Sequence, residues 1–408
     1  MSQLVGTSGQ TGRPALARLI DCGVADFERE YWDRQPLLSH GESYEDLFSV
    51  AAADELLSMR GLRAPFVRVA RQGRTLADRD FTAAGGVGAG VADQVSEDRI
   101  LEHFASGATI VLQALHRTWP PLTAFAQQLH DDLGHPVQVN AYLTPSQSRG
   151  FDHHYDVHDV FVLQVNGCKQ WRIHEPVHQR PLRTQPWTSH TDEVRIAAAT
   201  KPLIDAVLEP GDCLYLPRGY VHAATALGGT SAHVTIGVHP WTRRHLAEAL
   251  VGELLDAVGQ ESAERAALPL GLGGDGEQLV TAAAGVQRAL ARALGGLDLA
   301  EVAGRVISRE APGTRAEPVP PLTQAEQAQR LEDTSLLRLR AHLAPRLTAG
   351  VDGSVVLSSR AGRITLTTPE GTRVGDLLGR LAATSFPAAE LGVPLSRRLM
   401  LAGILVPA

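Results

Sequence analysis

The sequence predicts an α+β protein in which an antiparallel barrel or sandwich lies between helical segments. From Val137 to Pro240 the chain has short runs rich in β-branched and aromatic residues, separated by Asn-Gly, Pro-Gly and Pro-Arg-Gly turns. Such runs are typical of antiparallel strands. On both sides, Ala, Leu, Glu and Arg dominate and the apolar residues repeat with helical spacing. Because 408 residues exceed one ordinary core, two or three domains are expected.

The segment from Ala15 to about Asp132 is predicted to be mainly helical with short apolar interruptions. Helical periodicity is found in FEREYWDRQPLL, AADELLSMRGL, DRILEHFASGATIVL and LTAFAQQLHDDLG. The strands expected in the middle segment are VQVNAYL, VFVLQV, CKQWRIH, CLYLP and SAHVTIGV.

After Trp241 the pattern becomes helical again, as in RRHLAEALVGELLDAV and QLVTAAAGVQRALARAL. The stretch APGTRAEPVPP, from Ala311 to Pro321, is typical of a linker. Beyond it we expect a helix at LLRLRAHLAP, two strands at SVVLS and GRITLTT, a helix at VGDLLGRLAAT and a short apolar end at LMLAGILVPA. These elements predict a small helix-and-hairpin domain.

Composition narrows the class of protein. The hydrophobic fraction of 44% and charged fraction of 20% are those of a soluble globular chain. A net charge of −7 argues against a protein that binds nucleic acid over its whole surface. Cys22, Cys168 and Cys213 are odd in number and scattered, which fits neither a disulfide framework nor a Cys-rich zinc site. With no basic, apolar leader and no membrane-spanning run, a cytoplasmic location is expected.

Two residue types are almost missing. The only lysines are Lys169 and Lys201, and the only asparagines are Asn140 and Asn166. A biased genome that favours Arg over Lys would explain this composition. The few that remain are therefore favoured as residues with a chemical role.

The octapeptide DHHYDVHD, residues 152 to 159, concentrates three imidazoles and three carboxylates. The spacing His-x-Asp occurs in three places, and about one match is expected by chance, so the setting must decide between them: His130/Asp132, His154/Asp156 and His190/Asp192. The first pair lies in a helical pattern, where residues two apart face nearly opposite sides. The third lies in an apparent loop. Only His154 and Asp156 lie in an extended setting, where residues two apart share a face.

Two histidines and one carboxylate on one face of an octahedral ion are typical of non-haem Fe(II) oxygenases. The third ligand expected is His222, which lies 68 residues after His154 at the start of a strand in LEPGDCLYLPRGYVHAA. His158 shares the face of His154 and Asp156 and is the competing ligand; alternatively it supports a ligand from outside the metal's own shell, faces the substrate or is simply exposed. The plain alternative for the whole cluster is a set of surface histidines with turn-forming aspartates.

The dipeptide Asn166-Gly167 predicts a two-residue hairpin turn between VFVLQV and CKQWRIH. In that hairpin Gln164 would face Lys169. If the extended run from His154 is unbroken, Lys169 shares the face of the proposed ligands. A buried ammonium needs an anionic partner, and a dicarboxylate co-substrate that chelates the metal at its other end would supply one. A surface lysine near a turn is the alternative.

Several motifs in the same order, FEREYWDRQPLL, VNAYLTP, HYD, FVLQVNGCKQWRIHEP, LEPGDCLYLPRGYVHAA and HVTIGV, resemble the JmjC-type ribosomal oxygenases of the cupin superfamily. These are Fe(II)- and 2-oxoglutarate-dependent protein hydroxylases. The resemblance runs from about Phe27 to Pro240. It implies a double-stranded β-helix, the cupin or JmjC jelly roll, preceded by helices.

The resemblance also implies roles for individual residues. The iron ligands would be His154, Asp156 and His222, and Lys169 would pair with the distal carboxylate of 2-oxoglutarate. Further pocket residues would be Asn140, Tyr142 and Thr235. Gly237 departs from the pattern, because some relatives carry a hydroxyl residue there. The implied cofactors are Fe(II), 2-oxoglutarate as co-substrate, and O₂.

The implied domain order is a catalytic domain over 1–242, a helical dimerisation region over 243–312 and a winged-helix-like domain over 321–408. The implied substrate is a side chain, His or Arg, on a ribosomal protein, and the protein is expected to form a homodimer without membrane or nucleic-acid partners. Three other functions stay open: a tailoring hydroxylase of a peptide or small metabolite, a cupin enzyme using another metal for isomerisation or hydrolysis, and a non-catalytic metal-binding cupin regulator. His233 is expected inside the barrel, Trp32 and Trp171 as packing residues, and Arg218 as a brace of its turn.

Overall fold

The computed structural model describes residues 12–71, 73–146, 148, 151–268, 276–310, 315–350, 352–380 and 385–408. The chain divides into two compact units. One comprises Met1–Pro240 and Ala316–Ala408, and the other is Trp241–Arg315. The finer division into three domains remains a prediction.

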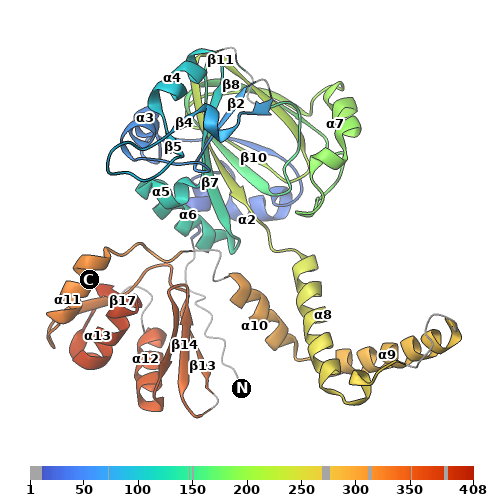
Figure 1. Cartoon of the computed structure of the whole chain (residues 1–408), viewed down its shortest axis with the longest axis vertical. Helices are drawn as coiled ribbons and strands as arrows, with labels where there is room; N and C mark the ends of the chain where they lie inside the picture. The colour runs from blue at the N-terminus through green and yellow to red at the C-terminus, as the bar shows by residue number, and fades with distance from the viewer. Residues whose placement is uncertain are drawn as a thin grey trace. The chain divides into compact units, whose positions relative to one another are not determined.

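A nine-stranded antiparallel sheet forms the core of the N-terminal part of the first unit, up to Pro240 (Figure 1). Its strands follow the order β1-β10-β8-β11-β7-β6-β2-β3, and β9 pairs with β8. Their bounds are β1 Leu37–His40, β2 Val67–Arg71, β3 Arg74–Thr75, β6 Thr109–Leu112, β7 Val137–Thr144, β8 Asp159–His174, β9 Ile204–Leu208, β10 Asp212–Leu216 and β11 Val221–Val238. The predicted JmjC-type jelly roll is confirmed.

Strands β8 and β11 are long, and they pair with each other along almost their whole length. The first half of β8 also pairs with β10, and the second half pairs with β9. Because β8 changes neighbours halfway along and β11 pairs with β7 only over its second half, the sheet coils on itself, and one face becomes an interior. This interior holds an apolar cluster that includes Val160, Val162, Trp171 and Ile173.

The predicted hairpin at Asn166-Gly167 is wrong. The chain runs straight through these residues within β8, and its partner is β11 rather than itself. Gly167 has a φ of +59°, and an added Cβ would lie 2.4 Å from the carbonyl oxygen of Thr230. The Asn-Gly signal therefore marks a bulge under a close backbone approach and not a turn.

The helices of the N-terminal part agree with the prediction, but its strands were missed. Three of these strands, β2, β3 and β6, extend the main sheet beyond β7, β1 pairs with β10 at its other end, and β4 (Thr82–Ala83) pairs with β5 (Gln94–Val95). These strands are short, so the helical pattern of the neighbouring residues dominated the prediction. The helical elements are α1 Pro14–Ala17, α2 Val24–Asp26, η1 Phe27–Tyr31, α3 Val50–Met59, η2 Asp78–Asp80, α4 Glu97–Ala105, α5 Leu115–Thr118 and α6 Pro120–Leu133.

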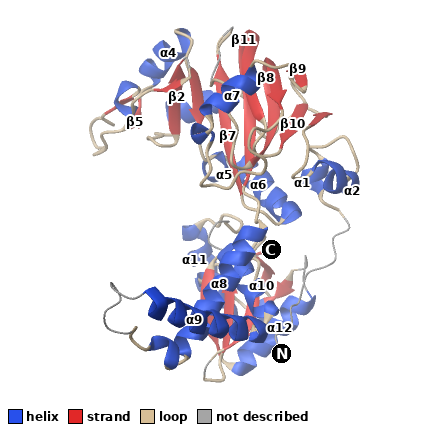
Figure 2. Ribbon diagram, turned by 90° about the vertical axis from the view of Figure 1, so that its right-hand side faces the viewer, coloured by secondary structure: helices blue, strands red, loops and turns tan. Residues whose placement is uncertain are grey.

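Local signals set the ends of these helices. Ser49 caps α3 by accepting a hydrogen bond from the Ala52 amide. Helix α6 begins at Pro120 and ends before Gly134, whose φ of +68° fits a left-handed cap. Helices α5 and α6 contact β7 and lie at the lower end of the sheet in Figure 2, and α4, which contacts β6, lies near β2 at its upper edge. On the other side, η3 (Trp187–Ser189) leads into α7 (Thr191–Ala198), which contacts β11.

Two small sheets build the C-terminal part. The first has the order β16-β12-β17, and the second has the order β13-β14-β15. The elements are α11 Pro321–Gln329, β12 Leu336–Leu339, β13 Arg346–Ala349, β14 Val355–Ser359, β15 Gly362–Leu366, α12 Thr368–Arg380, β16 Phe386–Pro387, η6 Ala388–Glu390, α13 Val393–Leu401 and β17 Leu405–Pro407. The strands at SVVLS and GRITLTT are present. The helix predicted at LLRLRAHLAP is wrong, because this segment forms β12 between β16 and β17.

The second unit is helical, as its sequence predicts, with α8 Arg243–Gln260, η4 Ala263–Arg265, α9 Gly276–Gly296 and α10 Leu299–Glu310. Leu246, Val251 and Leu255 of α8 are 44%, 53% and 61% exposed. Residues 311–314 of the predicted linker, and residues 381–384 at the end of the helix predicted at VGDLLGRLAAT, lie outside the described residues. No described helix has the length and apolar content that crossing a bilayer requires.

Candidate metal centre

The structure brings His154, Asp156 and His222 together. One possible ligand atom from each lies within 4.8 Å of the others, and this is the only such group found in the described part of the chain. A two-residue antiparallel bridge fixes the two histidines: the His154 amide donates to the His222 carbonyl at 3.1 Å, and the His222 amide donates back at 2.8 Å. Two imidazoles 68 residues apart thus share one backbone anchor.

Both imidazoles are oriented by backbone carbonyls. The Nδ1 atom of His154 lies 2.7 Å from the carbonyl oxygen of Asp152, and the Nδ1 atom of His222 lies 3.0 Å from that of Tyr220. These contacts place the proton on Nδ1 and leave the Nε2 lone pair of each ring free for an ion. The Nε2 atom of His222 lies 3.7 Å from Oδ2 of Asp156.

The electrostatics suit a cation. Burial raises the pKa of Asp156, but the facing imidazoles of His158, His222 and His154 together hold it below its ordinary value. Burial is the largest cause that lowers the pKa of His222, to about 4. One carboxylate is therefore ionised and its imidazole neighbour is neutral at physiological pH, which are the protonation states that metal ligands need.

His158 is not part of the ligand group. Its Nε2 atom lies 3.1 Å from Nε2 of Gln138, and its ring lies against the ring of His239, with centroids 5.0 Å apart. Gly237 makes room for it, because an added Cβ there would lie 2.7 Å from the imidazole. The imidazole of His158 thus occupies the space that a side chain at position 237 would need, which accounts for the glycine there.

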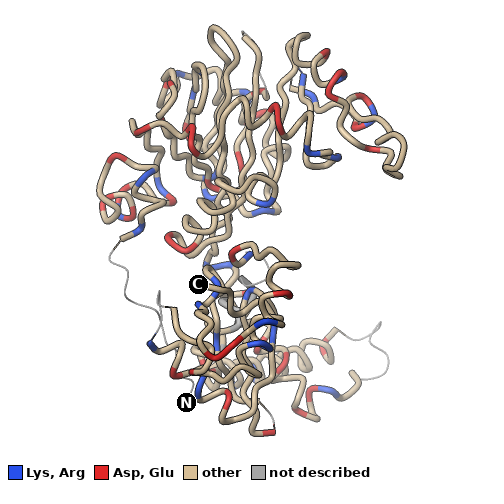
Figure 3. Tube along the Cα trace, turned by 90° about the vertical axis from the view of Figure 1, so that its left-hand side faces the viewer, with Lys and Arg blue, Asp and Glu red and all other residues tan. Residues whose placement is uncertain are grey.

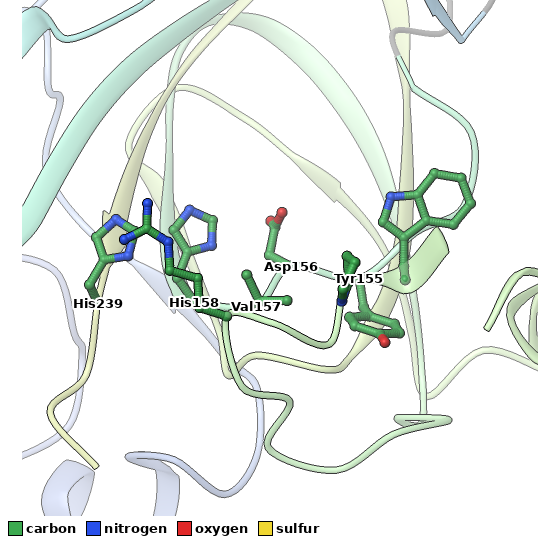
Figure 4. Close-up of a pocket in the computed structure, with 8 residues that line it drawn as sticks. Tyr155, Asp156, Val157, His158 and His239 are labelled. Carbon is green, nitrogen blue, oxygen red and sulfur yellow. The ribbon is translucent and has the colours of Figure 1, made fainter. Parts of the chain in front are cut away.

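A pocket of about 200 Å³ opens beside Asp156 (Figure 4). In Figure 4 Asp156 and His158 project to the same side of their segment, as the alternation of the sequence predicts, while Tyr155 points away. The segment is nevertheless not a strand, since β8 begins only at Asp159. The pocket is lined by Tyr155, Asp156, Val157, His158, Arg183, Pro186, Trp187 and His239.

The other predicted pocket residues share one face of β7 and β11. Asn140 pairs with Thr235 and Tyr142 pairs with His233 across the two strands. The Tyr142 and His233 rings are stacked, with centroids 4.9 Å apart and planes 1° apart. The structure thus places Asn140, Tyr142 and Thr235 side by side on the polar face of the barrel wall. Burial raises the pKa of Tyr142 to about 12.

Lys169 is buried in the barrel interior, with 3% of its surface exposed. Its Nζ atom donates to Oγ1 of Thr144 at 3.2 Å and lies 3.4 Å from Nδ1 of His233. Among the described residues, no carboxylate forms an ion pair with it. Burial therefore lowers the pKa of Lys169 to about 7.

Lys169 reaches the interior through the bulge in β8. Gln164 pairs with His233 and Asn166 pairs with Ala232, so Val165 has no partner in the register. One extra residue shifts the alternation of side chains, and odd-numbered Lys169 faces inward after it. Lys169 is thus interior, although the predicted hairpin and the unbroken strand from His154 are both wrong.

Trp171 stands between the two polar groups. Its ring centroid lies 6.0 Å from that of His222 and 5.5 Å from that of His233. The indole Nε1 atom is buried and has no hydrogen-bond partner among the described residues. The sequence assigned His233 and Trp171 to the interior and to packing, and their proximity to the candidate residues was missed. The period-two pattern around Thr235 is the signal that points to His233.

The remaining His-x-Asp pairs have structural roles. Asp132 accepts hydrogen bonds from the amides of Ala15 and Leu16, and His130 lies 2.8 Å from the His135 carbonyl. Histidine 190 stacks on His178. Neither pair lies in the ligand group.

Arg218 braces its turn, as expected. Its guanidinium, 7% exposed as a residue, lies 3.2 Å from Asp159 and 2.7 Å from Asp33. Asp159 also accepts a hydrogen bond from the hydroxyl of Tyr215 at 3.0 Å. Burial raises the pKa of Asp159, which makes its three donors necessary for the ionised form.

Residues 118–246 match the family model described as the JmjC domain. The match contains every residue of the ligand group and the buried lysine. This part of the chain is therefore similar to a JmjC domain.

Curated proteins similar to this chain include a demethylase and histidyl-hydroxylase and a ribosomal oxygenase. The chain is 31% identical over 259 residues to the Bifunctional lysine-specific demethylase and histidyl-hydroxylase NO66 of Drosophila mojavensis, covering 60% of this chain and 28% of the relative. It is 30% identical over 280 residues to Ribosomal oxygenase 1 of Homo sapiens, covering 64% and 40%. The chain thus spans well under half of the length of these relatives.

Solved structures agree on the fold. The structure of YcfD, a ribosomal oxygenase from Escherichia coli, in complex with cobalt and 2-oxoglutarate matches with a TM-score of 0.55 and 16% identity. The alignment covers 95% of this chain and 98% of that chain.

Proposed function

We propose that this protein is an Fe(II)- and 2-oxoglutarate-dependent oxygenase that hydroxylates a side chain of a protein substrate. The observation that carries the proposal is the pairing of two sites in one barrel. One is a group of two histidines and a carboxylate, and the other is a buried ammonium without an acidic partner among the described residues. The first suits a divalent ion and the second suits the far end of a diacid.

The residues present fit these groups. The Nε2 atoms of His154 and His222 and a carboxylate oxygen of Asp156 would hold the ion, and a His₂-carboxylate set leaves other positions open. The orphaned Nε1–H of Trp171 and the ammonium of Lys169 are donors that suit an anionic guest. When bound, iron would couple O₂ reduction to oxidative decarboxylation of 2-oxoglutarate and would supply one oxygen atom to a substrate C–H bond.

The protein itself would position the metal ligands and keep water out of the barrel. The bridge between His154 and His222 fixes the ligand geometry, and the apolar cluster below it excludes water from the barrel. The target side chain would enter through the pocket beside Asp156, since Asp156 is the residue of the ligand group that lines it. No acid/base pair of the protein is needed for such chemistry.

The substrate is inferred from the relatives. Their names describe a histidyl-hydroxylase and a ribosomal oxygenase. We propose that the substrate of this chain is a histidine or arginine side chain of a ribosomal protein. The net charge of −7 favours a basic partner. Figure 3 shows acidic and basic residues mixed along the loops and helices.

The helical unit supports a homodimer. Exposed apolar residues continue from α8 onto α9, where Leu279, Val280 and Leu294 are 38%, 70% and 54% exposed. An apolar helix surface of this kind suits a second copy of the same unit. A cytoplasmic location and a winged-helix-like role for the C-terminal part belong to the same proposal.

The proposal is tested by adding Fe(II) and then 2-oxoglutarate anaerobically to the purified protein. A visible charge-transfer band is expected in the unaltered protein and not in His154→Ala, and its appearance should need more 2-oxoglutarate in Lys169→Ala. The matched control is His190→Ala, which alters another His-x-Asp pair and should keep the band. Absence of the band from the unaltered protein would contradict the proposed oxygenase activity. Mass spectrometry of ribosomal proteins should then show a gain of one oxygen.

A further inference from the structure

His233 is a buried histidine that no step of the proposed reaction uses. It lies on β11 opposite Tyr142 and two residues before Thr235. Its exposure is 3%, and three groups surround its ring: the stacked phenol of Tyr142, the edge of Trp171 and the ammonium of Lys169. A polar ring packed this closely is fixed in orientation.

The contact between His233 and Lys169 joins two bases. Both are buried, and burial lowers the pKa of His233 well below its ordinary value, with the nearby Lys169 charge as a further cause. His233 is therefore neutral, and its Nδ1 lone pair can accept a hydrogen bond from the Lys169 ammonium. Together with Thr144, which lies 3.2 Å from Nζ, it holds two of the three N–H directions of Lys169. The third stays available for a guest.

The other groups around Lys169 do not replace this contact. The strands paired with β8 place Ala226 and Leu208 opposite it. Tyr142, from β7, is the remaining titratable neighbour of the pair, and it is neutral because burial raises its pKa. No described carboxylate faces the ammonium. The protonation of Lys169 therefore depends on its two acceptors and on whatever anion enters.

We propose that His233 is a positioning residue for the diacid co-substrate: it accepts a hydrogen bond from Lys169, directs the ammonium toward the distal carboxylate, and allows Lys169 to take up a proton when that carboxylate binds. The inference rests on the proposed function, since it requires 2-oxoglutarate at Lys169. It adds a residue that sets co-substrate affinity and predicts a pH dependence that metal binding does not share.

The sign of the pH dependence follows from the charge of the guest. An anion binds the protonated form of Lys169, and the pKa of that group in the empty protein is about 7. Above pH 7 each unit of pH should weaken 2-oxoglutarate binding about tenfold. Near pH 8 binding should take up close to one proton, and near pH 6 it should take up almost none.

The test compares His233→Leu, which removes the acceptor, with His233→Asn, which keeps an oxygen near the position of Nδ1. On the Co(II)-loaded protein we expect 2-oxoglutarate to bind at least tenfold more weakly to the Leu variant and nearly normally to the Asn variant. Co(II) affinity, measured from its visible spectrum, should stay within about twofold in both. Equal 2-oxoglutarate affinity in the Leu variant and the unaltered protein would overturn the inference.

Proton uptake is measured separately. Calorimetry of 2-oxoglutarate binding at pH 8, in buffers of different ionisation enthalpy, gives the number of protons taken up. Lys169 and Lys201 are the only lysines, so ¹³C-lysine labelling gives two side-chain signals. The signal that disappears in Lys201→Arg belongs to the exposed Lys201, and the other belongs to Lys169. The Lys169 signal should titrate near pH 7 and shift to the charged form on binding. Binding without uptake would overturn the inference alone, whereas no binding to the unaltered protein would overturn the proposed function with it.

Discussion

The barrel holds two polar sites that are built in opposite ways: the metal end, with His154, Asp156 and His222, and the basic end, with Lys169 and His233. The metal end is acidic at its centre and partly open: the Asp156 side chain is 33% exposed and lies beside a pocket. The other end is basic and closed, with Lys169 and His233 each 3% exposed. Trp171 contacts the polar groups of both ends. One end can exchange ligands with solvent, and the other can be satisfied only by a guest long enough to reach it.

Geometry prepares the metal end for its ligand, whereas electrostatics prepares the basic end. At the metal end the side chains are already held for an ion by backbone contacts, so little rearrangement is needed. At the basic end a buried ammonium is held by a hydroxyl and an imidazole, which is unfavourable until an anion arrives. Substitutions at the two ends should therefore act on different ligands.

The largest expected effect is on metal binding. His222→Ala removes one of three ligands, and because loss of even an outer partner costs roughly 10–100-fold in affinity, we expect a loss of at least about 100-fold for Co(II). Titration followed by the visible spectrum measures it. His233→Asn is the control at the other end, and a metal affinity equal to that of the unaltered protein in His222→Ala would show that the ion binds elsewhere.

The next effect concerns Gly167, which lies two residues after the unpaired Val165 of β8. Gly167→Ala adds a Cβ 2.4 Å from the Thr230 oxygen at a residue with φ of +59°. Left-handed backbone alone costs roughly 1–2 kcal/mol, and the clash adds to it, so we expect about 3 kcal/mol of destabilisation from urea unfolding. Gly228→Ala is the matched control: its φ is +71°, and nothing lies within 4 Å. Equal losses in the two variants would mean that close approach at Gly167 is unimportant.

The grouping of His154, Asp156 and His222 could be predicted from sequence because two of the three residues are neighbours in the chain. Alternation around His154 and Asp156 selects one of three His-x-Asp pairs, and a short strand start supplies His222. The Lys169 end depends on a bulge whose Asn-Gly signature is identical to that of a hairpin. Only pairing with β11, a strand more than 50 residues away in sequence, decides between them.

The fold shows the same division. Most jelly-roll strands are runs of β-branched and aromatic residues bounded by turn residues, while β1, β2, β3 and β6 are short and take their conformation from the sheet edges that they extend. The segment LLRLRAHLAP has helical spacing but is held as β12 between two neighbours. In both cases tertiary pairing overrides local preference. His233 was placed in the interior, but its partner could be found only from the register.

A substitution at the basic end should have opposite effects on binding and on stability. Lys169→Met removes a charge-assisted contact, worth roughly 1.5–3 kcal/mol, so 2-oxoglutarate should bind about 10–150-fold more weakly. It also removes a buried ammonium without an acidic partner among the described residues. The free energy of unfolding of the protein without co-substrate should therefore rise by about 1–2 kcal/mol at pH 7. Isothermal titration and urea unfolding measure the two effects.

The pH dependence of unfolding sharpens this prediction. The pKa of Lys169 in the folded protein is about 7, below its ordinary value of 10.5. Between these values the unfolded chain binds more protons, so this group makes the folded state more stable as the pH rises from 7 to 10.5. The Met variant should lack that contribution. A loss of stability in Lys169→Met at pH 7 would indicate an anion already bound beside the ammonium.

The smallest effect concerns the hydroxyl that holds Lys169. Thr144→Val keeps the shape of a fully buried side chain but removes the oxygen 3.2 Å from Nζ, so we expect a loss of about 0.5–1.5 kcal/mol in 2-oxoglutarate binding. Thr109, whose hydroxyl lies 3.1 Å from that of Thr144, gives the control: Thr109→Val should have less effect because it does not touch the ammonium. If the two valine variants bind the diacid equally, the hydroxyl contact does not orient Lys169, and His233 alone would carry that role.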